Sequence, residues 1–303
     1  MTNTFDPGNK VPVYAPLWNV ADLELPRDRA TLNAWARSFY ALDSDVNRLI
    51  NQHAMFIMNS FDLKESKSHK ANQFFIDQLN TLNLPALLEE IITQYFILGE
   101  VFLYLELNEA KGVWSRLIIQ NPDYIIVKRS VVSDSKYYLR PDENLRRICF
   151  SDRAEDKLIR NLIMPVIVEA VKNGENIPLD SFNIYTICHR MSPYEIRGTS
   201  FLTPLFTTLK KPDKSLEDKQ LIRESLWDIT AVENKTIGQD VLMMRYEMLV
   251  LSLENWFNTK LIAPIAKIQG FSTGTKVKKL VYPEVKFDRE KLKSALVKSI
   301  NYK

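Results

Sequence analysis

Ten residues, 95–104 (YFILGEVFLY), decide the fold class, because they join the end of a helix directly to the start of a strand. The helix is expected to open at Pro85, which suits a first helical turn, and to end near Gly99. Residues 101–107 and 113–119 are both rich in β-forming side chains, and the loop between them contains Gly112. The pattern predicts a helix followed at once by a β-hairpin.

Before this hairpin the chain has helical periodicity. From Thr31 to Ile57, apolar residues recur every three or four positions, as on one face of a helix. Asp43-Ser44-Asp45 suits a helix cap, so one long helix and two helices in line both fit. Another helix is expected through Phe74 and Leu82, and the proline-rich residues 1–30 are expected to form an extended arm.

After the hairpin, short strands and helices alternate. The expected strands lie at residues 124–127, 137–139, 184–189, 276–282 and 285–287. The expected helices lie at residues 158–171, 215–227, 242–262 and from 288 onward. The helix at 158–171 is expected to stop at Asn173-Gly174, and Ser215 with Asp218 has the spacing of a capping box. The order predicts an α+β fold that is rich in helices and has an antiparallel sheet.

The composition is that of a folded protein with a large core. Of 303 residues, 46% are hydrophobic and 25% are charged, which is near the globular average. The net charge of +3 is too small for a protein that coats nucleic acid, and eight glycines are few for a fold that cradles cofactors on glycine turns. Two distant cysteines suit a reducing compartment, and we expect a soluble cytoplasmic protein with no signal peptide and no membrane span.

The search for catalytic motifs returns near misses. Residues 270–276 (GFSTGTK) resemble a phosphate loop, but three residues separate the glycines where the motif needs four. His53, His69 and His189 lack metal-ligand spacing, and His53 is expected in the core. Cys188 and His189 are neighbours on an expected strand, so their side chains should point to opposite faces. We therefore expect no cofactor, no metal and no enzymatic activity.

Three stretches together carry a resemblance to a known family: the helix, glycine and strand at 95–104, residues 117–127 (LIIQNPDYIIV) and residues 184–200 (IYTICHRMSPYEIRGTS). Their order resembles the portal proteins of tailed double-stranded-DNA bacteriophages. In that family a helix, a glycine and a strand lead to a "P-x-x-v-x-V" strand. A "y-x-x-r-G-x-S" segment then precedes the helix that enters the stem. Residues 261–266 (LIAPIA) resemble part of the helix that returns into the wing domain.

The turns within these motifs also have ordinary physical explanations. Gly99, Pro122, Gly198 and Ser200 are the expected structural turn residues. Gly198 permits a turn with positive φ, and Ser200 can cap the helix expected next. Pro122 fixes φ in a turn where Asp123 can bond the backbone two residues on. On these residues alone, a set of ordinary turns remains the alternative.

The resemblance implies a complete set of functional expectations. A portal is a dodecameric ring at one capsid vertex, through which double-stranded DNA passes without sequence-specific contacts. The implied partners are further copies of the chain, DNA, the terminase that hydrolyses ATP, the major capsid protein and a head–tail adaptor, with no membrane. The implied location is the virion, after assembly in the host cytoplasm. The alternatives are another virion subunit, from a baseplate or connector, and a nucleic-acid-processing enzyme.

The resemblance also divides the chain. It implies an arm at 1–30, a wing at 31–200, a stem and clip region at 201–241, a returning wing helix and strand at 242–287, and the start of a crown helix at 288–303. The residues between Ser200 and Leu242 are too few for two stem helices and a large clip, so that region is minimal or incomplete. The position of the family's channel loop corresponds here to residues 233–240, with Asn234, Lys235, Thr236 and Gln239 as polar tips. A helix-capping loop is the alternative there.

Overall fold

The first helical region is divided in two by Asp43. Helix α1 (Arg29–Leu42) ends at this residue and α2 (Ser44–Asn59) begins after it, because the Asp43 carboxylate accepts hydrogen bonds from the backbone N–H groups of Asp45 and Val46. Of the two alternatives, the one with two helices in line is therefore correct. The computed structural model describes residues 26, 28–130, 133–190, 195–226, 235–271 and 281–301.

The predicted helix and hairpin at the centre of the chain are confirmed. Helix α4 (Leu84–Leu98) ends at Gly99, whose φ of 71° is left-handed, and strand β2 (Glu100–Asn108) follows immediately. β2 pairs with β3 (Val113–Gln120) on one side and β7 (Ile184–Cys188) on the other, and all pairing is antiparallel. Helix α3 (His69–Thr81) precedes α4, as predicted.

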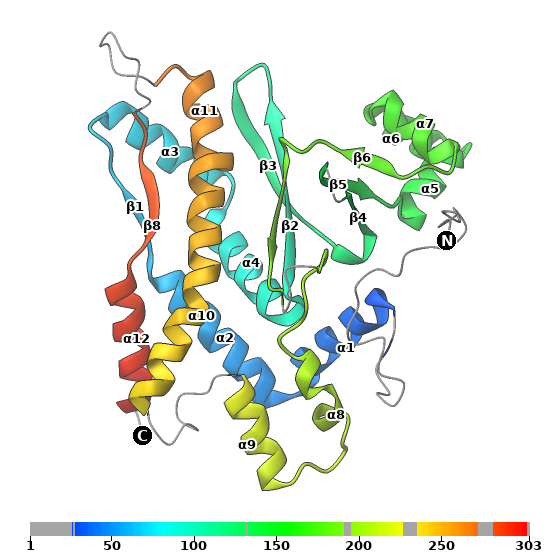
Figure 1. Cartoon of the computed structure of the whole chain (residues 1–303). Helices are drawn as coiled ribbons and strands as arrows, with labels where there is room; N and C mark the ends of the chain where they lie inside the picture. Colours follow the sequence, from blue (N-terminus) through cyan, green and yellow to red (C-terminus); the bar gives the residue numbers. More distant parts are fainter. Residues whose placement is uncertain are drawn as a thin grey trace, which may run out of the picture.

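A second antiparallel sheet lies beside the first (Figure 1). It contains β4 (Ile125–Ser130), β5 (Ser133–Leu139) and the short strand β6 (Ile177–Leu179), which the sequence pattern did not predict. Phe102 and Ile184 of the first sheet share a small buried cluster with Ile125 of the second. The two sheets therefore pack through the face of β2 that points away from α4.

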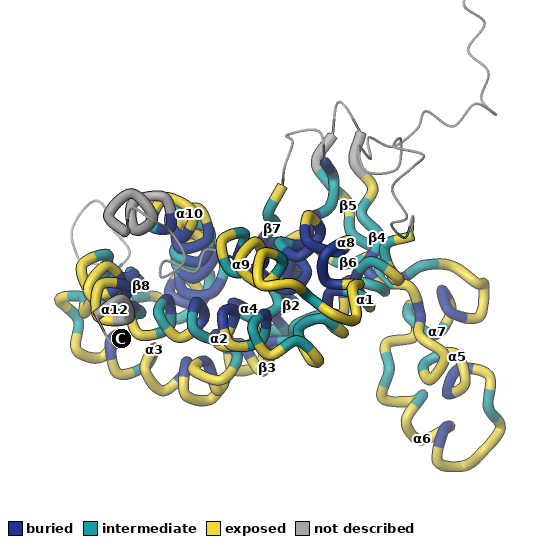
Figure 2. The backbone as a smooth tube through the Cα atoms, turned by 90° about the horizontal axis from the view of Figure 1, so that it is seen from below, coloured by how far each residue is buried: buried dark blue, intermediate teal, exposed yellow. Residues whose placement is uncertain are grey.

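Residues 143–172 form a separate lobe that projects from the rest of the molecule (Figure 2). Its helices are α5 (Glu143–Phe150), α6 (Ala154–Leu162) and α7 (Pro165–Lys172). The single helix expected at 158–171 is wrong, because a proline starts a new helix at 165, where its missing N–H costs nothing. The predicted stop is correct: Asn173 caps α7, and Gly174 follows with φ of 71°.

Residues 201–226 fold back onto the body. Instead of the helix expected directly after Ser200, they form the 3₁₀ turn η3 (Thr203–Leu205), the short α8 (Phe206–Leu209) and α9 (Leu216–Ser225). The capping box of Ser215 and Asp218 is confirmed, with both reciprocal hydrogen bonds present. Leu202, Phe206 and Ile222 are buried in the main core, which explains why this stretch stays against the body.

A long helical rod runs along the β3-β2-β7 sheet, on the side away from the second sheet (Figure 1). Its parts are α10 (Lys235–Trp256), the π-helical segment η5 (Phe257–Ile262) and α11 (Ala263–Ile268). Pro264 lacks an N–H, and its ring would clash with a carbonyl of the preceding turn in a regular α-helix, so the wider π turn accommodates it. The Trp114 indole of β3 donates to the Leu261 carbonyl at 2.8 Å and fixes the rod to the hairpin.

The chain closes with a strand pair that joins distant segments. The unpredicted strand β1 (Phe61–Lys64) pairs antiparallel with the predicted β8 (Glu284–Phe287). Helix α12 (Arg289–Asn301) then begins after Asp288, whose carboxylate accepts from two backbone N–H groups. Most of the strand expected at 276–282 falls outside the described residues.

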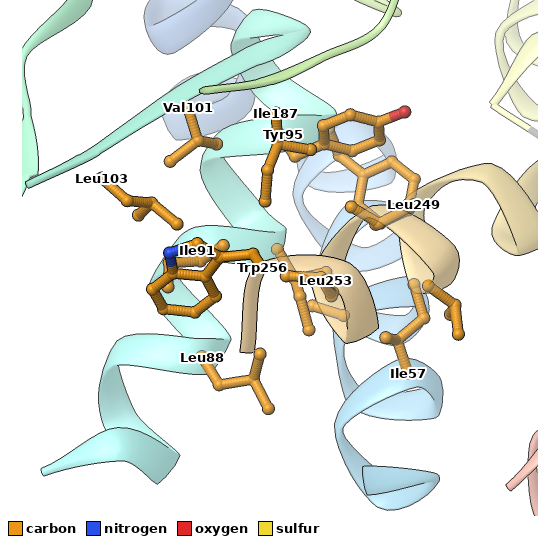
Figure 3. Close-up of a cluster of buried hydrophobic side chains, with 14 of the residues drawn as sticks. Ile57, Leu88, Ile91, Tyr95, Val101, Leu103, Ile187, Leu249, Leu253 and Trp256 are labelled. Carbon is orange, nitrogen blue, oxygen red and sulfur yellow. The ribbon is translucent and has the colours of Figure 1, made fainter. Parts of the chain in front are cut away.

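One main core connects these elements (Figure 3). Val101 and Leu103 of β2 face α4 and the rod, where Trp256 and Leu253 are fully buried. The predicted α+β fold class is thus confirmed. In the part of the chain that is described, no helix is long and apolar enough to cross a membrane.

Candidate functional site

The four turn residues expected from the sequence lie at one place in the fold. Gly99, Pro122, Gly198 and Ser200 surround an ion pair between two further residues, and we call the six together the junction: Gly99, Glu100, Pro122, Arg197, Gly198 and Ser200. The Gly99 carbonyl accepts from the backbone N–H of His189 at 2.7 Å, and the Ser200 hydroxyl donates to the Ile97 carbonyl at 2.5 Å. The segment 197–200 is therefore bonded to the last turn of α4, and His189 is bonded to the residue that ends this helix.

The ion pair at the centre joins a buried carboxylate to a half-buried guanidinium. Glu100 is 0% exposed, and its two carboxylate oxygens accept from Nε and Nη2 of Arg197 at 2.8 and 2.5 Å. The Gly198 backbone N–H donates to the same carboxylate at 2.9 Å. Two parallel hydrogen bonds of this kind fix the relative orientation of both groups.

Arg197 also binds the backbone of the turn that links the two sheets. It donates to the carbonyls of Pro122 at 2.9 Å and Ile125 at 2.8 Å. Burial disfavours the charged form of Arg197, but the hydrogen bonds and charge of Glu100 outweigh it and raise the pKa of the guanidinium. The guanidinium of Arg197 therefore stays charged at this site.

Helix α1 is tied to the same region by two more arginines. Arg29 donates to the Gly198 carbonyl at 2.6 Å, and Arg37 donates to Asp123 at 2.6 Å. Asn33 donates to the other Asp123 oxygen at 2.6 Å. The expected bond from Asp123 to the local backbone is thus wrong: Asn121 caps the 3₁₀ turn η2 (Pro122–Tyr124), and the Asp123 carboxylate binds α1 instead.

The two glycines of the junction have different roles. Gly99 has a positive φ of 71°, and a Cβ there would lie 2.0 Å from the Thr199 carbonyl oxygen. Gly198 does not have a positive φ, so the expectation of a left-handed turn at this residue is wrong. It is needed because a Cβ would lie 2.0 Å from the Gly99 carbonyl oxygen. Ser200 likewise caps no helix; its hydroxyl accepts from the Leu202 backbone N–H in a local turn.

A small polar hollow of about 220 Å³ opens beside the junction. Its lining includes Arg37, Glu90, Gln94, Glu100 and Gln120. Arg37 and Glu100 already bind Asp123 and Arg197, and among the described residues that line the hollow there is no histidine, cysteine, serine or lysine. These bonds hold α1, β2 and the segment around Arg197 together at the edge of the hollow.

The nearby Cys188 and His189 do not form a thiolate pair. Burial, with a smaller contribution from the charge of Glu100, raises the pKa of Cys188 to about 11. Burial also lowers the pKa of His189, whose ring stacks on Phe201 at a centroid distance of 3.9 Å. At neutral pH the sulfur is therefore a thiol, and the thiol is a poor nucleophile.

His53 lies in the core, as predicted. Its Nε2 donates to the Leu226 carbonyl at 2.8 Å, so Nδ1 accepts from the Tyr246 hydroxyl in the neutral ring. His69 is exposed at the start of α3. Within the described ranges, no group of three or more histidine, cysteine, aspartate or glutamate side chains is placed to hold a metal ion.

The expected channel loop is only partly covered by the described residues. Asn234 lies outside them, whereas Lys235, Thr236 and Gln239 lie in the first turns of α10. The part of the expected loop from residue 235 onward is therefore helix, and its proposed contact with DNA stays a prediction. The residues of the phosphate-loop-like stretch beyond Phe271, including Lys276, lie outside the described residues.

Sequence reasoning did not identify the ion pair at the centre of the junction. One signal was present: Glu100 stands in a run of apolar β-forming residues directly after Gly99. A carboxylate in a buried strand requires a cationic partner, because an unpaired charge is too costly to bury. The partner, 97 residues later in sequence, was not deducible from local pattern.

Comparison with known proteins adds little to these observations. No protein-family model matches the sequence, and no curated protein is significantly similar to it. A solved structure described as the virion of a native gene transfer agent particle contains a similar chain, with 14% sequence identity and a TM-score of 0.41. The match covers 95% of this chain and 69% of that one.

Proposed function

We propose that the chain is a structural subunit of a virion and, more specifically, a ring-forming portal protein. One observation carries the proposal: the segments that contain the portal-like motifs, 99–100 and 197–200, meet in one buried junction. Separate ordinary turns have no reason to share an ion pair and two close backbone approaches. The contact supports reading the motifs as parts of one architecture.

The junction supports a mechanical role in this proposal. It ties α1, the end of α4, β2 and the turn before β4 to the segment that leads into residues 201–226. A subunit that transmits force around a ring must keep such segments in fixed orientation. Bidentate and fully hydrogen-bonded pairs do so better than apolar contacts alone, because they are directional.

The proposed partners follow from the portal function. They are further copies of the chain, double-stranded DNA in the channel, the terminase, the major capsid protein and a head–tail adaptor. We propose that the chain itself performs no catalytic step and that hydrolysis belongs to the terminase. Purified protein incubated with ATP or plasmid DNA and magnesium should show no turnover; turnover abolished by Lys276→Ala would refute this part.

The proposal is tested by locating the protein in purified particles. Gold labelling of an epitope-tagged chain should place it at a single capsid vertex, and class averages of that vertex should show a ring with a channel wide enough for a duplex. Labelling at the distal end of the tail would favour the baseplate alternative. Absence from particles would contradict a virion role altogether.

A further inference from the structure

Helix α6 has its polar side turned inward and its apolar side turned outward. The Asp156 carboxylate is only 3% exposed and accepts from Nη1 of Arg147 at 2.8 and 2.9 Å. On the same side, Arg160 donates to the carbonyls of Cys149 and Ser151 at 3.0 and 3.1 Å. These bonds fix α6 to α5 through its charged residues.

The opposite side of α6 is exposed and apolar. Leu158 is 70% and Leu162 is 87% exposed, one helical turn apart. The outer apolar residues of the lobe, which we call the lobe face, are Phe150, Leu158, Ile159, Leu162, Met164 and Val166. An amphipathic helix in a monomer normally buries its apolar side, so this orientation indicates a surface that is covered in an assembly.

The lobe face is large enough for a stable interface. The exposures of its six residues add up to roughly four fully exposed apolar residues, an area on the order of a few hundred Å² and typical of an interaction site. A specific protein–protein interface buries about 800 Å² on each partner, including a polar rim. The apolar centre of such an interface is thus already present on this lobe.

A second apolar surface lies on the other side of the molecule. On α10, Met244, Met248 and Leu251 are 73%, 67% and 48% exposed and follow the i, i+4, i+7 spacing of one helical stripe. We call them the rod stripe. Figures 1 and 2 both show α10 and the lobe on opposite sides of the sheet that contains β2.

We propose that the lobe face of one subunit docks on the rod stripe of the next copy in a head-to-tail ring. Two different surfaces on opposite sides give a heterologous contact, which generates a ring when the rotation closes, whereas one self-complementary patch gives a dimer. A membrane is a poorer occupant, because α6 carries two acids beside its two bases. This inference rests on the proposed ring and adds the surfaces that build it.

The first test compares two substitutions at matched positions. Leu162→Asp places a charge in the lobe face, and Leu42→Asp is its control. Both leucines are the last residue of a helix, and they are 87% and 86% exposed. Leu162→Asp should lower the ring fraction at least tenfold with an unchanged circular dichroism spectrum, whereas Leu42→Asp should assemble like the unsubstituted chain.

The second test identifies the occupant by disulfide cross-linking of Leu162→Cys and Met248→Cys. A cross-linked dimer should form when the two variants are mixed during assembly and not when either is assembled alone. The unsubstituted chain controls for the native cysteines. Cross-linking of Leu162→Cys with itself would overturn the head-to-tail contact. If the Leu162→Asp variant still forms rings, the lobe face is not the contact surface, but the proposed portal function stands. If the unsubstituted chain forms no ring, both the proposed contact and the proposed function are refuted.

Discussion

A Cβ atom on Gly198 would lie 2.0 Å from the carbonyl oxygen of Gly99, so the two glycines allow the backbones of segments 99 residues apart to touch. The approach is reciprocal, because a Cβ on Gly99 would lie 2.0 Å from the Thr199 carbonyl oxygen. Only backbones this close allow the Gly198 N–H to reach the Glu100 carboxylate. The glycines and the ion pair are therefore parts of one structure.

Gly99→Ala should destabilise the protein far more than Gly174→Ala. Both residues follow a helix and have φ of 71°, but no atom lies within 4 Å of a Cβ on Gly174. The strain of the left-handed conformation should cost about 1–2 kcal/mol at each site. Gly99→Ala adds a backbone clash that should cost at least about 3 kcal/mol more. Urea unfolding midpoints measure the difference, and equal midpoints would refute the close approach.

Glu100→Gln should cost about 3 kcal/mol of unfolding free energy, because it leaves the half-buried Arg197 charged without its hydrogen-bonded carboxylate partner. The control is Glu106→Gln. Glu106 makes a similar two-bond pair with Arg116, but the two side chains are 37% and 64% exposed. A solvated pair contributes less than about 1 kcal/mol. Similar losses in the two variants, measured by chemical denaturation, would show that the junction pair is not specially stabilising.

Tyr246→Phe should destabilise the core by about 1–3 kcal/mol, because the buried Nδ1 of His53 loses its hydrogen-bond donor. Tyr40→Phe removes a hydroxyl that donates to Asn51 at the surface, and it should change stability by less than about 0.5 kcal/mol. Thermal unfolding of both variants provides the comparison. An unchanged melting temperature for Tyr246→Phe would show that the hydrogen bond between Tyr246 and His53 does not stabilise the core.

Alkylation of Cys188 by iodoacetamide should be slow at neutral pH and should rise with pH without a plateau up to 9.5. Its pKa of about 11 exceeds the usual 9.0, so at pH 8 the thiolate fraction is about 100-fold lower than for an ordinary cysteine. Below pH 10 the rate should increase about tenfold for each pH unit. Mass spectrometry of the labelled peptide follows the reaction, with urea-unfolded protein as reference. A plateau near pH 7 would indicate an activated thiolate.

Local signals predicted much of the secondary structure. The Asp43 cap, the helix stop at Gly99 and the capping box at Ser215 each depend on residues within one turn of one another, and each is confirmed. Pro165 was an equally local signal for two helices in place of one, and sequence reasoning did not use it.

Long-range contacts were beyond the reach of these patterns. Strand β1 has only four residues and is stabilised by β8, whose Phe287 pairs with Phe61. A positive φ was also predicted at Gly198. A glycine in a turn motif can be required for a left-handed conformation or for a close backbone contact, and the sequence does not distinguish the two. The four turn residues of the site were identified. The pairing of Arg197 with Glu100 was not, because it depends on how the fold brings two distant segments together.

Counting the subunits of the assembled protein decides whether this chain forms a ring. Purified full-length protein would be measured by light scattering at micromolar concentration in physiological salt and imaged by electron microscopy. We expect closed rings with a central channel, and the resemblance to portals implies twelve subunits. A stable monomer in solution, together with no ring of this chain in purified particles, would contradict this expectation.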